Sequence, residues 1–349
     1  MISQIAHSKP YITQEDIESV DKVLVGVQIS QGLLVRQFEH EVAEYLNVHD
    51  GVSTASGTAA LHLALLALGF IKGKEVIMPT YVCKSVAEAI MSVGLIPIYC
   101  DVDEQWSMTV ESVEQVFSKN TCAIIIVHIF GIPVDVQSFQ QFNVLIIEDS
   151  CQSFGARVNM SACGTVGDIG FYSFHATKCL TTGEGGFVVS RDGDFVDRLR
   201  NIRDGSYPES PRLASPMSDI QAALGLSQLR RYDTFLARRK YIAGLYFRRM
   251  KNLPIDLPFS LVDQSIFFRF PVKVTGNFEK YYNAFIQQGI NVRKGVDRLL
   301  HQDGTQSFNV CFSGAEKIFK ETISIPIYPA LSDDDIERIV MIANMVFAG

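Results

Sequence analysis

The sequence lacks the signatures of several large classes of protein. Acidic residues outnumber basic ones, 38 to 31, and the net charge of −7 argues against a nucleic-acid-binding protein, because such proteins normally present a basic face. The seven cysteines are scattered and form no C-x-x-C pair, which argues against a disulfide framework or a zinc site and favours a reducing compartment. The longest apolar stretches are shorter than a membrane span, and the N-terminal segment shows no signal-peptide pattern. We therefore expect a soluble, cytoplasmic protein with no metal site and no membrane or nucleic-acid partner.

The length and composition suit a globular protein with one large and one smaller domain. The chain has 349 residues, of which 47% are hydrophobic and 20% charged. Between about residues 50 and 190, short apolar runs alternate with helical patterns, as in βαβ units. The runs are continuous, which is typical of strands buried on both faces of a mainly parallel sheet. They lie at 75–80, 123–130, 144–150 and 169–174, and the helical patterns lie at 58–69, 85–93 and 110–119.

The C-terminal third has a different order of elements. A long helical stretch begins at Ser218 and leads into this part of the chain. It is followed by a strand pattern at 266–274, a helical pattern at 277–288 and a closing helix with a capping box at Ser332 and Asp335. The sequence thus predicts an α/β fold with a large domain, residues 1–235, and a small C-terminal domain, residues 236–349.

Polar residues follow the predicted strands and open the first predicted helix. In an open parallel sheet, ligands bind at the carboxyl ends of the strands, so these residues are the candidates for chemistry. Gly57 and Thr58 open the helix at 58–69, where free N–H groups and the helix dipole favour a phosphate, although such residues also form ordinary helix caps. Ser173 ends the strand at 169–174 and offers a second hydroxyl, although a lone serine there is also common in turns.

Two charged residues lie in apolar or uncharged surroundings. Asp149 ends the run at 144–150, where a carboxylate is costly unless it pairs with a cation or a donor; capping of the next turn is the simpler alternative. Gln152 follows three residues later and can present its amide to the same space. Lys178 lies in "SFHATKCLTTGEGG", a run with few other charges. A partly buried amine is more readily neutral and becomes a nucleophile, whereas an ordinary surface lysine extends its charge into water.

Together these groups match the requirements of pyridoxal 5′-phosphate (PLP). This cofactor needs a lysine for its aldehyde, a carboxylate for its protonated pyridine nitrogen and a cradle for its phosphate. Lys178, Asp149 and the hydroxyl and N–H groups at positions 57, 58 and 173 would supply these three functions. None of these elements is specific alone, but the ordered set predicts a PLP enzyme.

Longer segments of the sequence resemble one family of PLP enzymes. These segments are "STASGTAALHLALLALG", "EDSCQSFGA", "GDIGFYSFHATKCLTTGEGGFVVS" and "MSDIQAALGLSQL", and the likeness extends over most of the chain. They are similar to the DegT/StrS family of PLP-dependent sugar aminotransferases. The resemblance implies an α/β, fold-type-I PLP transferase, in which a large domain with a mainly parallel sheet carries a smaller C-terminal α/β domain. It also implies a homodimer with active sites at the interface.

The resemblance assigns roles to individual residues. It implies that Lys178 is the Schiff-base lysine, that Asp149 pairs with the pyridine nitrogen and that Gln152 lies by the ring hydroxyl. The residues implied at the phosphate are Gly57, Thr58 and Ser173. The usual reaction of the family moves an amino group from L-glutamate to a keto sugar, most often one linked to a nucleotide. Related sugar dehydratases replace the lysine by histidine, so the lysine of this chain favours transamination.

Two segments depart from the family pattern. Cys83 stands where many relatives place an aromatic side chain against the cofactor ring, and a sulfur packs there with less area. Ala214-Ser215-Pro216 stands where many relatives have Asn-x-Arg or Asn-x-Lys, which reach the partner's phosphate site and the substrate. Arg212 or Arg203 could supply the missing charge.

Four residues are expected near the substrate: His175, Glu184, Arg212 and His301. For His175 a bond to the turn backbone, and for Glu184 exposure on a loop, are the alternatives. The leading hypothesis is an aminotransferase that moves an amino group from L-glutamate to a keto sugar, nucleotide-linked, in amino-sugar biosynthesis. The alternatives are a keto-cyclitol as acceptor, or a non-catalytic regulatory protein with a PLP fold.

Overall fold

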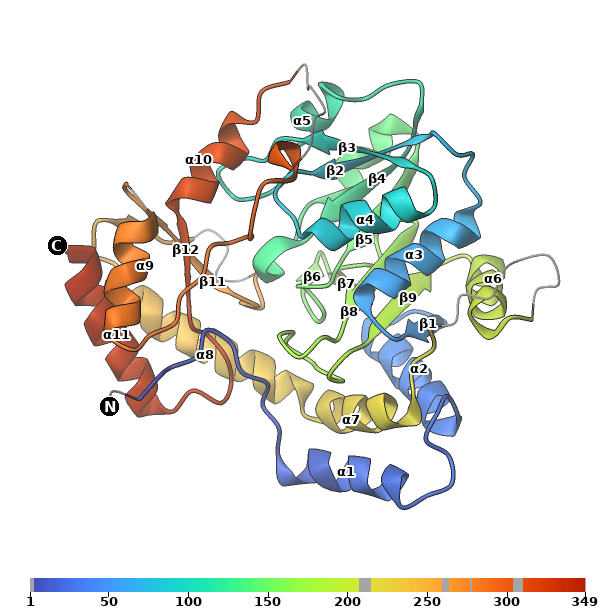
Figure 1. Ribbon diagram of the computed structural model, residues 1–349, viewed down its shortest axis with the longest axis horizontal. Helices are drawn as coiled ribbons and strands as arrows, with labels where there is room; N and C mark the ends of the chain where they lie inside the picture. Colours follow the sequence, from blue (N-terminus) through green and yellow to red (C-terminus); the bar gives the residue numbers. More distant parts are fainter. Residues whose placement is uncertain (1–2, 207–214, 259–263, 277, 304–309, 349) are drawn as a thin grey trace.

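A seven-stranded sheet lies at the centre of the larger part of the molecule, with strand order β1-β9-β8-β5-β4-β2-β3 (Figure 1). The computed structural model describes residues 3–206, 215–258, 264–276, 278–303 and 310–348. The strands of this sheet are β1 (Gly51–Thr54), β2 (Glu75–Pro79), β3 (Ile96–Cys100), β4 (Thr121–Val127), β5 (Leu145–Asp149), β8 (Ile169–Ser173) and β9 (Gly186–Ser190). A two-stranded ribbon, β6 (Arg157–Val158) and β7 (Ser161–Ala162), lies between β5 and β8 in the chain.

The sheet is parallel except at β9. Neighbours among β8, β5, β4, β2 and β3 run parallel, whereas β9 pairs antiparallel with both β1 and β8. A parallel neighbour requires a long crossover, usually through a helix, and the link from β8 to β9 is a loop over residues 174–185. The chain therefore turns straight back, and the predicted mainly parallel α/β sheet is confirmed with this one reversed strand.

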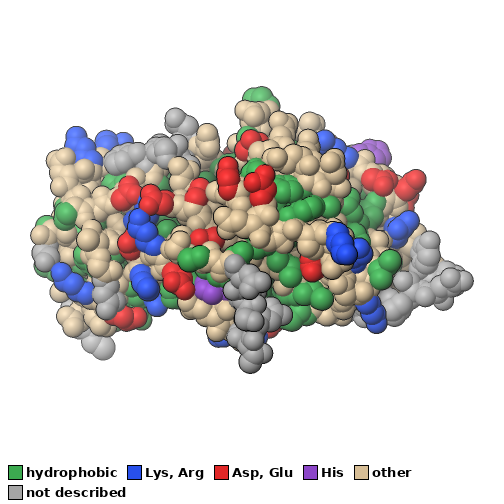
Figure 2. Space-filling view, turned by 90° about the horizontal axis from the view of Figure 1, so that it is seen from above, with side chains coloured by type: hydrophobic (Ala, Val, Ile, Leu, Met, Phe, Trp, Pro, Cys, Tyr) green, Lys and Arg blue, Asp and Glu red, His purple; other side chains and the backbone are tan. Residues whose placement is uncertain are grey.

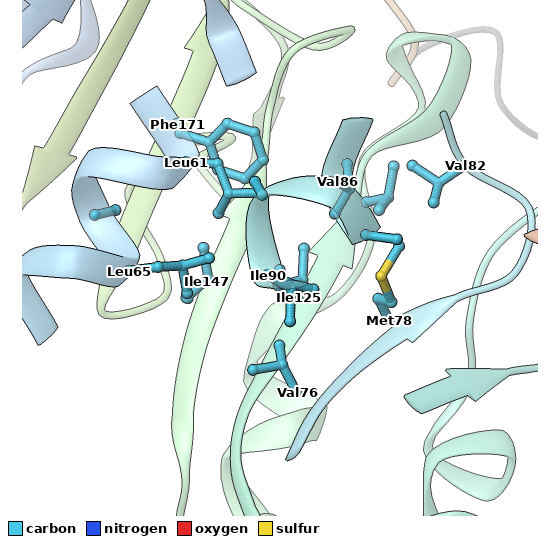
Figure 3. Close-up of a cluster of buried hydrophobic side chains, with 14 of the residues drawn as sticks. Leu61, Leu65, Val76, Met78, Val82, Val86, Ile90, Ile125, Ile147 and Phe171 are labelled. Carbon is cyan, nitrogen blue, oxygen red and sulfur yellow. The ribbon is translucent and has the colours of Figure 1, made fainter. Parts of the chain in front are cut away.

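Helices cover both faces of the sheet. Successive strand residues point to opposite faces, so Phe171 belongs to one apolar cluster and Tyr172 to another. The first face is covered by α3 (Gly57–Leu68), α4 (Lys84–Ser92) and α6 (Gly193–Asp204); Figure 3 shows Leu61 and Leu65 of α3 within its core. The other face is covered by α2 (Leu33–Leu46), α7 (Asp219–Arg230), α5 (Val110–Glu114) and the 3-10 turn η2 (Val136–Phe142). Helix α1 (Gln14–Leu24) lies against α7.

A second core lies in the C-terminal part of the chain. The three-stranded sheet β10 (Ile255–Asp256), β11 (Phe270–Val274) and β12 (Thr322–Ile325) packs with α9 (Phe278–Gln287) and α11 (Asp333–Ala348), and α10 (Ser313–Glu321) precedes β12. Helix α8 (Tyr232–Met250) joins the two cores, because Phe235 packs in the first part and Ile242 in the second. The proposed boundary at residue 235 falls near the start of this helix. Ile5 also packs in the second core, although the sequence division placed it with the large domain.

Three predicted elements differ from the structure. The helical stretch from Ser218 breaks at Arg231, which leaves the helical conformation (φ −112°, ψ 4°) and places its guanidinium 2.7 Å from the buried Asp16 carboxylate of α1. The helix predicted at 110–119 ends at Glu114. The strand predicted at 266–274 begins at Phe270, because Phe267 adopts a left-handed conformation with φ 53°. The predicted capping box is present, since Ser332 Oγ accepts a hydrogen bond from the Asp335 amide at 3.1 Å.

Among the described residues, neither a helix able to span a membrane nor a cluster able to hold a metal ion is present. Acidic, basic and hydrophobic side chains are interspersed over the coloured part of the face in Figure 2. Within the described ranges, no helix has the length and apolar character that crossing a membrane requires. The same ranges contain no group of three or more His, Cys, Asp or Glu side chains placed to hold a metal ion.

Candidate active site

A cavity of about 340 Å³ lies at the carboxyl ends of the central strands. It is bounded by the start of α3, the start of α4, the end of β5, the end of β8 and the loop after β8. This is the edge at which an open α/β sheet binds ligands. The residues predicted from sequence that line it are Gly57, Thr58, Cys83, Asp149, Ser173, His175, Lys178 and Glu184.

Lys178 is held by the loop that reverses the chain between β8 and β9. Its backbone N–H donates to the carbonyl of His175 at 2.8 Å. The loop is closed by two hydrogen bonds of Phe174, whose N–H donates to Gly185 (2.8 Å) and whose carbonyl accepts from Thr182 (2.9 Å). The Lys178 Nζ atom lies 5.0 Å from the centroid of the Phe268 ring. The reversal at β9 thus places the amine over the cavity and fixes its backbone.

Asp149 supplies a buried carboxylate to the same cavity. Only 3% of its surface is exposed, and its Oδ1 accepts a hydrogen bond from the Cys151 N–H at 3.0 Å. Burial raises the pKa of Asp149 above its ordinary value, while the Cys151 amide and the charge of Lys178 offset part of this rise. A carboxylate in such surroundings is stabilised by a cationic partner, which a protonated pyridine nitrogen would provide.

A second buried carboxylate fixes the strand end that carries Asp149. Glu148 accepts hydrogen bonds from the amides of Gly164, Val166 and Gly167 at 2.6–2.7 Å. Nδ1 of His128 accepts from the Val134 amide at 3.0 Å, so Nε2 carries the proton and donates to Glu148 at 2.8 Å. Burial alone would raise the pKa of Glu148, but these hydrogen bonds hold it below its ordinary value. His128 thus has a structural role, because both of its ring nitrogens are hydrogen-bonded within the protein.

The start of α3 and the end of β8 form a tight polar pocket. Ser56 caps α3, because its Oγ accepts from the Ala59 amide at 3.2 Å. Gly57 approaches Ser173 so closely that a Cβ atom at position 57 would lie 2.7 Å from the Ser173 Cβ. Thr58 is exposed in the open cavity. Free N–H groups, the helix dipole and hydroxyls therefore converge on one spot, as an anion site requires.

Gly57→Ala tests whether this close approach matters for the anion. The added methyl group collides with Ser173 and separates the helix N-terminus from β8, so we expect PLP affinity to fall roughly 10- to 100-fold. Titration of the apo protein with PLP measures the effect. Gly193→Ala is the matched control, because a Cβ at that position meets nothing within 4 Å. Equal affinities for the two variants and the wild type would show that the cradle lies elsewhere.

Two thiols share the cavity with the charged groups. Cys83 is exposed to the open cavity and Cys151 lies beside Asp149. The surrounding protein and the charge of Asp149 raise the pKa of both thiols, that of Cys151 well above its ordinary value. Both are therefore protonated at neutral pH and are poor nucleophiles beside the Lys178 amine.

His175 and Glu184 lie together at the rim of the cavity. Nδ1 of His175 accepts from the Thr177 amide at 3.2 Å, which leaves the proton on Nε2. That Nε2 atom faces the Glu184 carboxylate at 3.5 Å. The Nε2–H group of His175 can donate a hydrogen bond to a hydroxyl group of a bound molecule, and the Glu184 carboxylate can accept one. Both alternatives raised from sequence are present too, since His175 bonds to the turn backbone and Glu184 is exposed.

Other predicted residues do not line the cavity. Gln152 turns its Oε1 to the Phe130 amide (2.8 Å). His301 stacks on Phe312 with a centroid separation of 4.0 Å and bonds to Thr80 Oγ1 at 2.8 Å, so packing holds its ring away from the cavity. Arg212 lies outside the described residues, as does Ala214. Arg203 is buried and ion-paired with Glu39 and Asp204, which makes it unavailable to a substrate.

The structure adds cavity residues that sequence reasoning missed. They are Leu61, Ser85, Val86, Cys151, Phe171 and Thr177. Ser85 follows β2 at the start of α4, so its position at a strand's carboxyl end was a usable signal. Leu61, Val86 and Phe171 belong to the core cluster of Figure 3 and form an apolar floor that the sequence cannot distinguish from ordinary core.

Comparisons with known proteins agree with this architecture. The model of the DegT/DnrJ/EryC1/StrS aminotransferase family matches residues 10–343. The chain belongs to this family. The resemblance inferred from the motifs is confirmed, and the protein is an enzyme of the sugar-aminotransferase class, whose members depend on PLP.

Relatives of this aminotransferase include enzymes named for nucleotide sugars. GDP-perosamine synthase of Escherichia coli O157:H7 is 36% identical over 70% of this chain and 71% of its own length. UDP-N-acetyl-3-dehydro-alpha-D-glucosamine 3-aminotransferase of Acidithiobacillus ferrooxidans is 30% identical over 100% of this chain and 98% of its own. The aminotransferase TlmJ of Streptoalloteichus hindustanus has the same fold, with a TM-score of 0.93, 27% identity and 99% coverage of both chains. The PLP form of Streptococcus pneumoniae Spr1654 superposes with a TM-score of 0.91 at 25% identity, covering 98% and 99% of the two chains.

Proposed function

We propose that this aminotransferase binds PLP in the cavity and transfers the amino group of L-glutamate to a nucleotide-linked keto sugar. The observation that carries the proposal is the meeting of the Lys178 amine, the buried Asp149 carboxylate and the cradle at Gly57 and Ser173 in one cavity. The family membership and the PLP form of a structural neighbour support the same cofactor.

The residues present fit this cofactor. Glycine at position 57 lets the N-terminus of α3 lie against Ser173, so that the helix end and the Ser173 hydroxyl can hold a phosphate together. Burial raises the pKa of Asp149, and a carboxylate buried in this way is stabilised by a cation. The cavity also has an apolar floor of Leu61 and Phe171 for a planar ring. Cys83 lies at the cavity wall, where its sulfur can pack against the ring.

Each group has a distinct task in transamination. Bound PLP supplies an aldehyde that condenses with amines and a ring that accepts electrons. Asp149 keeps its negative charge beside the ring nitrogen and so favours the protonated ring. The Nζ atom of Lys178, once free, accepts the proton from the donor's Cα and returns it on the other side of the C–N bond. The cradle at Gly57 and Ser173 holds the phosphate end in place.

The names of the relatives support a nucleotide-linked keto sugar as acceptor. Two of the relatives compared above are named for GDP- and UDP-linked sugars. The His175–Glu184 pair at the rim suits sugar hydroxyls. A keto-cyclitol remains the second candidate, because Ser215 and Pro216 replace the residues that many relatives use near the substrate.

A panel of nucleotide-linked keto sugars, with L-glutamate as donor and product mass as readout, tests the acceptor. The proposal expects a mass corresponding to replacement of one carbonyl oxygen by an amine in at least one nucleotide sugar. Turnover of a keto-cyclitol with none of the nucleotide sugars would support the second candidate instead.

We further propose a homodimer whose interface borders the cavity. Val25, Val27 and Leu33, in and beside the α1–α2 connection, expose 79%, 104% and 80% of their surfaces. A hollow of about 860 Å³ lies next to them, between α1, α2 and α7. Residues 215–219 connect this surface to the cavity. Asp219 accepts a hydrogen bond from the Gly32 amide at 2.9 Å. The carbonyl of Ser215 accepts one from the amide of Ala55, which precedes Ser56 of the cavity, at 2.8 Å.

Val27→Glu combined with Leu33→Glu tests the interface. We expect wild-type protein to sediment at twice the mass of the 38.8 kDa chain, and the double variant to shift to the monomer with loss of most activity. Met341→Glu combined with Met345→Glu, at exposed positions of α11, is the control. A monomeric wild type that is active would contradict the proposal.

A further inference from the structure

A guanidinium and the Lys178 amine both lie near the ring of Phe268. Arg269, just before β11, places its Cζ atom 5.7 Å from the centroid of the Phe268 ring. Lys178 Nζ approaches the same ring to 5.0 Å. The amine and the guanidinium therefore lie at one aromatic ring, and a dicarboxylic amino acid that hydrogen-bonds to Arg269 can extend toward Lys178.

Arg269 forms an ion pair with no carboxylate among the residues that the structure describes. Its Nη1 donates to the carbonyls of Lys294 (3.0 Å) and Gly295 (2.8 Å), and its other N–H groups make no hydrogen bond to a described residue. Burial and the neighbouring charge of Arg293 lower the pKa of Arg269, and Asp297 and Tyr81 act in the opposite direction. The guanidinium stays charged at neutral pH, so it retains the capacity to bind an anion.

The backbone that carries this arginine is fixed from beneath. Arg239 of α8 is buried, and its Nη1 donates to the carbonyls of Phe267 (3.0 Å), Phe268 (3.2 Å) and Ile327 (2.9 Å). The left-handed Phe267 is thereby held in the conformation that aims Phe268 at Lys178. Arg269 is thus positioned before any ligand arrives, which reduces the entropy lost on binding.

We propose that Arg269 binds a carboxylate of the amino-acid donor. This inference rests on the proposed function, because it assumes that an amino acid delivers its amine at Lys178. A guanidinium offers two parallel N–H groups to a carboxylate, and such charge-assisted pairs are among the strongest hydrogen bonds in proteins. Anchored at Arg269, the donor has its amine held near the Lys178 Nζ. The negative charge of the bound carboxylate would also reduce the repulsion between the guanidinium groups of Arg269 and Arg293.

Arg269→Met tests the proposal in separate half-reactions. In the first half-reaction, L-glutamate converts the PLP form of the enzyme to the aminated form, and the loss of visible absorbance measures the conversion. In the second, a nucleotide-linked keto sugar restores the PLP form and its absorbance. We expect the half-saturating L-glutamate concentration to rise roughly 100-fold, with the bound-PLP spectrum and the keto-sugar half-reaction unchanged. Arg269→Lys, which keeps the charge, should recover part of the loss.

Two amides of glutamate identify the carboxylate. The α-amide and glutamine, the γ-amide, each lack one negative charge, and wild type should discriminate against at least one of them. Arg269→Met should abolish the discrimination against that amide, a result that a merely structural role of Arg269 would not produce. Arg298→Met, an exposed arginine paired with Asp303, is the matched control and should leave both half-reactions unchanged.

The outcomes distinguish this inference from the proposed function. Unchanged glutamate saturation in Arg269→Met, or a loss confined to the keto-sugar half-reaction, would overturn the inference and assign the guanidinium to the acceptor's phosphates. A wild type that binds no PLP would overturn the proposed function itself, before any variant is compared.

Discussion

Lys178→Ala is expected to reduce the turnover number at least about 10⁴-fold. In the proposed function, the Lys178 amine condenses with PLP and its Nζ atom moves the proton between two positions of the substrate, and the variant lacks this amine. The cradle at Gly57 and Ser173 remains, so PLP should still bind, without a covalent link. The enzyme is mixed rapidly with L-glutamate. The change in absorbance and the amount of 2-oxoglutarate, determined by mass spectrometry, give the rate of the variant relative to wild type.

Lys84→Ala is the matched control for this variant. Lys84 starts α4 next to Cys83, but it is exposed and pairs with Glu88 at 2.9 Å. We expect this control to retain the wild-type rate. A Lys178→Ala variant that keeps a tenth or more of the wild-type rate would show that another group moves the proton.

Asp149→Asn is expected to reduce turnover roughly 10²- to 10³-fold. The amide keeps the size of the side chain and the position of the strand end, but it removes the charge that, in the proposed function, stabilises a protonated ring nitrogen. The loss should appear in both half-reactions, because the ring accepts electrons in each. Asp334→Asn, at an exposed position in the first turn of α11, is the control and should behave as wild type.

The same substitution should stabilise the protein without PLP. Because burial raises the pKa of Asp149, the folded protein holds this proton more tightly than the unfolded chain does. The apo protein therefore loses stability as the pH rises from below the ordinary aspartate pKa, about 3.9, through the raised value. At pH 7, apo Asp149→Asn should melt higher than the apo wild type, yet gain less on adding PLP. A lower melting temperature of the apo variant would contradict this electrostatic account.

Much of the fold followed from local hydrophobic pattern. The four predicted apolar runs correspond to β2, β4, β5 and β8, because strands covered by helices on both faces must be apolar throughout. The reversal at β9 was not predicted, since strand direction depends on the connection and the loop at 174–185 carries no hydrophobic signal. The break at Arg231 was also missed. It depends on Asp16, more than two hundred residues away in sequence, and local propensity alone favours one continuous helix.

The site was predictable where position along a strand determines exposure to the cavity. Asp149, Ser173 and Lys178 follow strand ends, and the structure brings them together as expected for an open sheet. Their roles stay predictions until tested. His301 and Arg269 could not be placed from sequence, because tertiary packing decides where they lie. The ring of His301 stacks on Phe312, and Arg269 lies near the same Phe268 ring as Lys178.

The central claim, that Lys178 carries PLP in this cavity, is tested most directly by trapping the covalent link. The protein is incubated with PLP, reduced with borohydride, digested and mapped by mass spectrometry. The account predicts one labelled peptide, with the pyridoxyl group on Lys178 and no label when Lys178→Ala is treated in parallel. A label on another lysine, or a wild-type protein that remains unlabelled, would contradict it.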